Sequence, residues 1–184
     1  MHACGSYQSF LGFEFDSLTN DYKVVRVVYP YKLDLSRCEV YHPKVEVYSL
    51  RTSSWKPITA SVPSCNMVKF FWHQVFVNGA AHWITYKRRQ GEDGTHNVIL
   101  CFGKGNEVFG KIGLPEVVVS VSLLHLCLRS LRDMMCVEFY DKMAACTRFS
   151  SWVMGEYGVV ESWTKMCIVD MPVEDKDTID LLGV

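Results

Sequence analysis

The chain repeats a pattern in which one aromatic residue is followed seven positions later by a second, with turn-forming residues between them. The three pairs are Phe15 with Tyr22, Tyr48 with Trp55, and Phe102 with Phe109. A β-hairpin whose arms meet at this offset places the two rings beside each other, where cross-strand aromatic pairs stabilise a sheet. A fourth, looser copy runs from Trp152 to Trp163 over a longer connection. We therefore expect a chain built from hairpins.

The spacing of these pairs selects among β architectures. Tyr48 and Phe102 are 54 positions apart, and Phe102 and Trp152 are 50 apart. A period near 50 residues with about four strands per unit is typical of a kelch-like propeller blade. Phe15 lies only 33 positions before Tyr48, so we interpret its hairpin as the inner part of the blade that Trp55 closes. The sequence predicts an all-β, kelch-like β-propeller.

The rest of the chain agrees with this fold class. Short apolar runs are rich in Val, Ile, Phe, Tyr and Trp, and helical spacing is tolerable only over residues 123–132. Asn78-Gly79 between apolar runs is a strong hairpin signal, because both residues accept a positive φ. We expect Trp83, which follows this turn, to pack between blades, with exposure as a ligand platform as the alternative.

Composition excludes several classes of protein. The 184 residues suit one domain, and a net charge of −1 lacks the excess of cations that a nucleic-acid binder needs. The longest nearly apolar run, residues 117–128, is too short for a membrane span, which takes about 20 residues. The start shows no secretory signal, and the eight cysteines form no C-x₂-C pair. We expect reduced core thiols in a cytoplasmic or nuclear protein, without cofactor or metal.

Catalytic chemistry finds little support in the sequence. No Gly-x-Ser-x-Gly, phosphate loop or His-Glu-x-x-His occurs, so no catalytic residue is assigned. A metal site would need His73 and His82 to converge with Cys65 and Cys101, and their spacing fits no closed motif. Glu156 and Glu161 are either a carboxylate pair or, more simply, solvated turn residues.

Binding through a loop is the better hypothesis, since rigid β folds carry function on their loops. Tyr86, Lys87, Arg88 and Arg89 place three consecutive cations beside an aromatic ring. This group suits an acidic or phosphorylated target protein, held by charge-assisted hydrogen bonds. The alternative interpretation is a solvated hairpin tip.

Five segments in order resemble the F-box-associated domain of plant F-box proteins. They are Leu11-Gly12-Phe13-Glu14-Phe15 through Arg26, Val45-Glu46-Val47-Tyr48 with Trp55, Val77-Asn78-Gly79-Ala80-Ala81-His82-Trp83, Asn106-Glu107-Val108-Phe109 with Leu114-Pro115-Glu116, and Trp152-Val153-Met154-Gly155-Glu156-Tyr157-Gly158 with Glu161-Ser162-Trp163-Thr164-Lys165. The resemblance implies a kelch-type β-propeller that captures a target protein. It also implies that an F-box hands this target to a cullin-RING ubiquitin ligase through the Skp adaptor.

The sequence departs from the family in places. Ten residues before Leu11 are too few for an F-box, so we expect partnership with Skp and cullin only through an F-box that this chain lacks. Gly103 stands where the family usually has Asp, and residues 123–128 replace a glycine-rich strand, which suggests a distorted blade. Measured against the family, we expect a partial propeller of about three blades, and we divide the chain into an extension (1–10), an incomplete propeller (11–170) and an acidic tail (171–184).

The sequence thus leads to two hypotheses of function. The first is a non-catalytic protein-interaction module, the substrate-recognition domain of an SCF-type ubiquitin ligase receptor. The alternative is a β-propeller that binds a glycan or small ligand on its aromatic side chains. Burial of Trp55, Trp83 and Trp163 discriminates between them, because only exposed rings serve as platforms.

Overall fold

Three antiparallel sheets make up the computed structural model, which describes residues 7–16, 19–30, 44–59, 66–67, 74–88, 95–103, 107–120, 125–142 and 146–172. Sheet A has the order β1 (Tyr7–Asp16), β2 (Asp21–Pro30), β3 (Lys44–Ser49) and β4 (Ser54–Ile58). Sheet C has the order β10 (Leu126–Leu131), β11 (Met134–Lys142), β12 (Cys146–Met154) and β13 (Trp163–Pro172).

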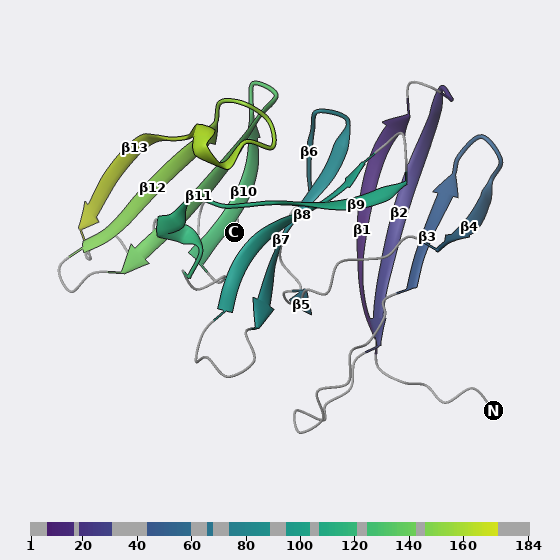
Figure 1. Ribbon diagram of the computed structural model, residues 1–184, viewed down its shortest axis with the longest axis horizontal. Coiled ribbons are helices and arrows are strands. Elements are labelled where there is room, and N and C mark those ends of the chain that lie inside the picture. Colours follow the sequence, from purple (N-terminus) through teal and green to yellow (C-terminus); the bar gives the residue numbers. More distant parts are fainter. Residues whose placement is uncertain are drawn as a thin grey trace.

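Sheet B lies between them and has a divided first strand. β5 (Asn66–Met67) and β6 (Val75–Val77) both pair with β7 (Ala80–Arg88), which is followed by β8 (Thr95–Gly103) and β9 (Val108–Ile112). Short 3₁₀ helices occur at Glu116–Val118 (η1) and Val160–Ser162 (η3). With β5 and β6 counted as one divided strand, each sheet is a four-stranded meander, and the three sheets stand side by side in chain order (Figure 1).

The expected all-β, propeller-like fold is confirmed, with one sheet for each expected blade. The hairpin of Phe15 and Tyr22 forms the inner half of sheet A, and the hairpin of Tyr48 and Trp55 closes it, as the short first interval predicted. None of the helices in the described part of the chain is long and apolar enough to cross a membrane.

The aromatic pairs occupy the register that their offset predicts. Phe15 is opposite Tyr22, Tyr48 is opposite Trp55, and Phe102 is opposite Phe109. Their ring centroids are 4.9, 5.3 and 4.8 Å apart, within the range in which aromatic rings attract each other. The Asn78-Gly79 turn also forms as predicted, with φ values of 50° and 72° that match a type I′ hairpin turn.

Two apolar cores lie between the sheets. The first joins sheets A and B through Val25, Val27, Val45, Val47, Ala81, Trp83, Leu100, Phe102 and Phe109. The second joins sheets B and C around Ile84, Ile99, Leu126, Val137 and Trp163. Sheet B therefore buries both of its faces, whereas sheets A and C each bury one against a described neighbour.

Trp83 fixes the contact between sheets A and B. Its indole N–H donates to the Leu11 carbonyl at 3.2 Å, and the Phe10 ring meets it edge-on at 5.4 Å. Gly12 makes this approach possible, because a Cβ there would lie 2.6 Å from Trp83 Cζ2 and 2.7 Å from a Val25 methyl group. Beside it, the Gln74 amide bonds both backbone groups of Phe13, at 2.6 and 2.8 Å.

The last sheet shows how its unusual segment folds. Within the stretch 123–132, where helical spacing was tolerable, residues 126–131 form β10, because Leu126 and Leu128 alternate into the core. β10 pairs regularly with β11 over these six residues. Trp163 lies opposite Met154 and not beside Trp152, whose ring is instead covered by the Lys165 ammonium at 5.1 Å.

Candidate functional site

The turns that connect the first strand to the second and the third to the fourth gather at one end of the molecule, which we call the hairpin-tip end. In Figure 1 the β1–β2, β3–β4, β6–β7 and β10–β11 turns lie at the top. The rigid sheets hold these turns in place, so this end offers a preformed surface. Two features on it involve more than one sheet, namely an ionic network and a hollow.

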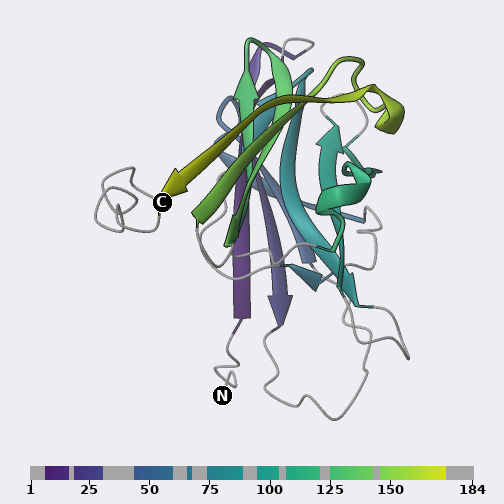
Figure 2. The same cartoon turned by 90° about the vertical axis from the view of Figure 1, so that its left-hand side faces the viewer.

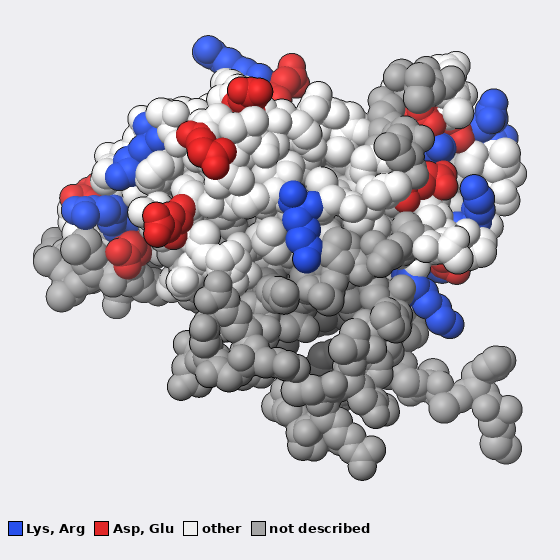
Figure 3. Space-filling view, in the orientation of Figure 1, with Lys and Arg blue, Asp and Glu red and all other residues white. Residues whose placement is uncertain are grey.

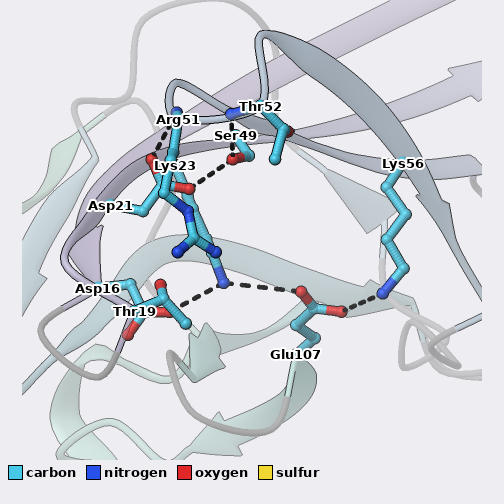
Figure 4. A network of polar contacts seen from close by, with 9 residues as sticks. All are labelled: Asp16, Thr19, Asp21, Lys23, Ser49, Arg51, Thr52, Lys56 and Glu107. Carbon is cyan, nitrogen blue, oxygen red and sulfur yellow. Dashed lines mark hydrogen bonds and ion pairs between the residues drawn. The ribbon is translucent and has the colours of Figure 1, made fainter.

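The ionic network joins sheet A to the β8–β9 turn of sheet B (Figure 4). Lys23 Nζ lies 2.9 Å from Asp16 and 3.8 Å from Glu107, and Lys56 Nζ lies 3.6 Å from the other oxygen of Glu107. Thr19 donates its hydroxyl to Asp16 at 2.6 Å. The charges thus satisfy one another, which indicates a structural link between two blades.

Asp21 orders the β3–β4 turn in the same region. Its carboxylate accepts the Ser49 hydroxyl and, at 2.8 Å, the Arg51 backbone N–H. The Ser49 hydroxyl bond is the largest cause that keeps the pKa of Asp21 below its usual value, and the Arg51 N–H adds to it. This side chain is therefore a fixed anion that braces a turn, and its oxygens are already occupied.

The hollow opens between sheets B and C and has a volume of about 230 Å³. It is lined by residues of the β6–β7 turn, the β10–β11 turn and the β12–β13 loop: Val77, Asn78, Asp133, Met134, Met135, Met154, Gly155 and Tyr157. Three of the eight are methionines, whose flexible and polarisable side chains adapt to different partners. Asp133 and Asn78 add polar groups, so the hollow suits an apolar side chain of a protein ligand.

His82 is fully buried and contacts Tyr157, one of the residues that line this hollow. Its Nε2 lies 2.8 Å from the Tyr157 hydroxyl, and its Nδ1 lies 3.2 Å from the Val75 carbonyl. Because a carbonyl only accepts, Nδ1 carries the proton and Nε2 accepts the tyrosine O–H. Burial lowers the pKa of His82 to about 4 and raises that of Tyr157 to about 12, so both are neutral at pH 7.

The β12–β13 loop that carries Tyr157 is held by its own hydrogen bonds. Ser162 accepts the Glu156 N–H at 3.0 Å, and its hydroxyl lies 2.7 Å from the Val159 carbonyl. Gly158 has a φ of 83°, a conformation that suits glycine. With the Tyr157–His82 bond, these contacts make the loop a fixed rim of the hollow.

The sequence singled out a different group of residues for target binding. Tyr86, Lys87 and Arg88 lie at the far end of β7, which begins at the Asn78-Gly79 turn, so they are at the end opposite the hollow. Their side chains and all of Arg89 lie outside the described residues. No pattern in the sequence groups Met134, Met154 and Tyr157, although Glu156-Tyr157-Gly158 is part of the family resemblance.

The three tryptophans that discriminate between the two hypotheses of function differ in burial. Trp83 and Trp163 are buried between sheets, and Trp163 donates its indole N–H to the Gly113 carbonyl at 2.9 Å. Trp55 is nearly half exposed, with the Arg26 guanidinium 4.6 Å from its ring centroid. Two of the three therefore pack between blades, and one remains open to solvent.

Among the residues described, no group of three His, Cys, Asp or Glu side chains is placed to hold a metal ion. His82 is bound to Tyr157, while Cys65 and His73 of the hypothetical metal site lie outside the described residues. Glu156 and Glu161 are both exposed. Figure 3 shows charges of both signs scattered over the described part of one face, with uncharged surface between them.

The three sheets define a propeller-like β fold, and comparison with known proteins identifies its family. Residues 2–181 match the model of the F-box associated beta propeller domain, and the chain belongs to this family. It is 31% identical over 176 residues to F-box protein CPR1 of Arabidopsis thaliana, covering 89% of this chain and 41% of that protein. It is 28% identical over 187 residues to F-box protein At4g22390 of Arabidopsis thaliana, covering 94% of this chain and 43% of that protein. The chain thus spans about two fifths of the curated relatives it matches.

Proposed function

We propose that this chain is a non-catalytic, substrate-recognition module of an SCF-type ubiquitin ligase receptor, and that its target binds at the hairpin-tip end. The observation that carries the proposal is the hollow between sheets B and C, whose methionine lining and fixed tyrosine rim suit an apolar side chain of a protein. Family membership supports it, because the relatives are named F-box proteins.

The same proposal assigns the ligase partners. Skp and cullin would be reached only through an F-box, which is not part of the propeller domain that residues 2–181 match. The cytoplasm or nucleus is the proposed location, and the free state of the five described cysteines, Cys101, Cys127, Cys136, Cys146 and Cys167, supports a reducing compartment.

Target capture with two competing variants tests which end binds. Met134→Asp places a charge in the hollow, and Lys87→Glu with Arg88→Glu reverses two cations at the opposite end. We expect the wild-type chain to retain target proteins from a plant extract. Met134→Asp should lose these proteins, whereas the double variant at Lys87 and Arg88 should still retain them. Joined to an F-box, the wild-type chain should promote ubiquitination of those proteins in a reconstituted SCF reaction, and Met134→Asp should not. If only the Lys87→Glu, Arg88→Glu variant lost capture, the target would bind at that end of β7 and not at the hollow. Capture without ubiquitination would refute the ligase role.

The second candidate function, binding of a glycan or small ligand, is favoured by one observation. Trp55 is exposed, and the Phe13 and Tyr22 rings are stacked with centroids 5.7 Å apart on the same face of sheet A. A Trp55→Ala variant that loses binding on a glycan array, while Met134→Asp keeps it, would support this function over the first.

A further inference from the structure

One face of sheet A has no described sheet against it. Side chains alternate along strands, and Gly12, Val25 and Val47 point to sheet B, so the residues between them point away. We call this surface the free face of sheet A, formed by Leu11, Phe13, Phe15, Tyr22, Val24, Arg26, Glu46, Tyr48 and Trp55. Five of these apolar side chains are among the exposed large ones: Leu11, Phe13, Phe15, Tyr22 and Trp55.

The other two sheets show what covers such a face. In every sheet the turn between the third and fourth strands is followed by a large ring on the face toward the preceding sheet: Trp55, Phe109 and Trp163. Phe109 and Trp163 are only 7% and 8% exposed, because sheets A and B respectively cover them. Trp55 is 44% exposed, since no described sheet precedes sheet A.

A second set of equivalent positions gives the same result. Tyr22, Ala81 and Met135 are each the second residue of the second strand, and each faces the preceding sheet. Ala81 and Met135 are 0% and 1% exposed, against 47% for Tyr22. The free face of sheet A therefore has the residue pattern of a face that another sheet covers.

Sheet C has a face that would meet a following sheet, and no described sheet lies against it. This free face of sheet C is formed by Cys127, Arg129, Leu131, Cys136, Glu138, Tyr140, Phe149, Ser151 and Val153. Cys136 and Ser151 at its centre contact each other and are only 2% and 1% exposed. In Figure 2, which looks onto this side, the strands of sheet C lie in front of the others. Tyr140 and Phe149 form a ring pair at 5.2 Å on it, and Leu131 is a third exposed.

The charged side chains in the middle of the two faces are already paired. Arg26 bonds Glu46 on sheet A, and Arg129 Nε bonds Glu138 at 2.8 Å on sheet C. Each pair lies among apolar side chains on neighbouring strands, so the middle of either face can be covered without leaving a lone buried charge. Lys44 lies on the same face of sheet A as Glu46, at the exposed first position of β3. The two faces thus match each other in chemistry, as a preceding and a following face do inside this fold.

We propose that the chain binds a second copy of itself, with the free face of sheet C of each copy covering the free face of sheet A of the other. The contact repeats the packing of A on B and of B on C. A heterologous contact of this kind grows into a filament unless its rotation closes it. Two such contacts related by a two-fold axis close a ring of six sheets, which leaves no sheet face uncovered.

Analytical ultracentrifugation of the purified chain over a range of concentrations tests the ring. A species of twice the 21.1 kDa chain mass is expected, with no larger polymers. Phe13→Asp on sheet A and Leu131→Asp on sheet C should each weaken dimerisation at least tenfold. Both side chains are exposed, and the Phe13 backbone keeps its bonds to Gln74, so circular dichroism should show folded variants. Val117→Asp, at an exposed site on η1, is the matched control and should dimerise normally.

Mixing the two variants distinguishes this contact from others. A mixed dimer keeps one intact contact, between the unaltered sheet A of one variant and the unaltered sheet C of the other. Mixing should therefore restore a dimer that neither variant forms alone. A monomer at all concentrations, open-ended polymers, or insensitivity to Leu131→Asp, as for a dimer through sheet A alone, would each overturn the proposal.

Discussion

The buried pair of His82 and Tyr157 should make the fold sensitive to acid in a defined pH window. His82 has its pKa lowered by burial from 6.5 to about 4 in the folded chain, whereas the unfolded chain keeps the ordinary value. Between these values the unfolded state binds more protons, so unfolding becomes easier as the pH falls. Stability from this residue is present above pH 6.5 and is lost on the way to pH 4.

The magnitude follows from the two pKa values. A difference of about 2.5 pH units corresponds to about 3 kcal/mol in full, and to about 2 kcal/mol of free energy of unfolding lost between pH 7 and pH 5. The groups that face His82 do not titrate in this window, because burial raises the pKa of Tyr157 to about 12 and also raises that of Cys101. The effect is therefore assigned to the imidazole.

Urea unfolding at pH 7 and pH 5, followed by tryptophan fluorescence and circular dichroism at one chain concentration, measures this loss. His82→Gln is the matched variant, because its amide can still donate to the Val75 carbonyl and it does not titrate. The wild-type chain should lose about 2 kcal/mol more than this variant between the two pH values. Equal losses in the two proteins would refute the assignment to His82.

Three further predictions concern the packing of the sheets. Gly12→Val should destabilise the chain by about 1–3 kcal/mol in urea unfolding, because its Cβ would lie 2.6 Å from Trp83 Cζ2. Gly103→Ala is the control and should change the stability little, because the nearest atom to its Cβ would be 3.8 Å away. Equal effects of the two substitutions would contradict the steric argument. Trp163→Phe removes the bond to the Gly113 carbonyl and should cost about 1–3 kcal/mol by the same measurement, whereas an unchanged midpoint would mean that this bond contributes nothing. Burial raises the pKa of the Cys136 thiol, so iodoacetamide should label it slowly at pH 8 until urea unfolds the chain; rapid labelling of the folded chain would show that the site opens.

The hairpins were predictable because their determinants are local. The offset of seven positions from Tyr48 to Trp55 fixes which residues face each other across the turn, and no distant contact is needed. In the fourth copy the offset is longer, and the expected ring pair does not form. The longer loop after Met154 shifts the register and puts Trp163 opposite Met154. The spacing over residues 126–131 did not decide between helix and strand, because a short apolar run fits either period and pairing with β11 sets the conformation.

The candidate site was not predictable in the same way. His82 and Tyr157 are 75 positions apart, and the hollow above them needs turns from two different sheets. No spacing in the sequence relates Asn78 to Asp133 or either to Tyr157, since only the stacking of sheet B on sheet C brings them together. The group Tyr86 to Arg89 stood out because its members are adjacent in the chain, which is the kind of signal a sequence can carry.

The aromatic pairs also carry information that goes beyond the hairpins they close. Cross-strand ring contact contributes about 0.5–1.5 kcal/mol beyond area burial, whether or not another sheet covers the rings. Covering a large ring adds more, because burying a side chain such as Phe contributes about 1.5–3 kcal/mol. Phe102 and Phe109 receive both contributions, whereas Trp55 receives the second only in part. The same offset in the sequence therefore encodes two interactions, the contact between the two rings and their burial by another sheet. The ring pairs of sheet A make the first contact fully, and they are fully buried only when another sheet covers the free face.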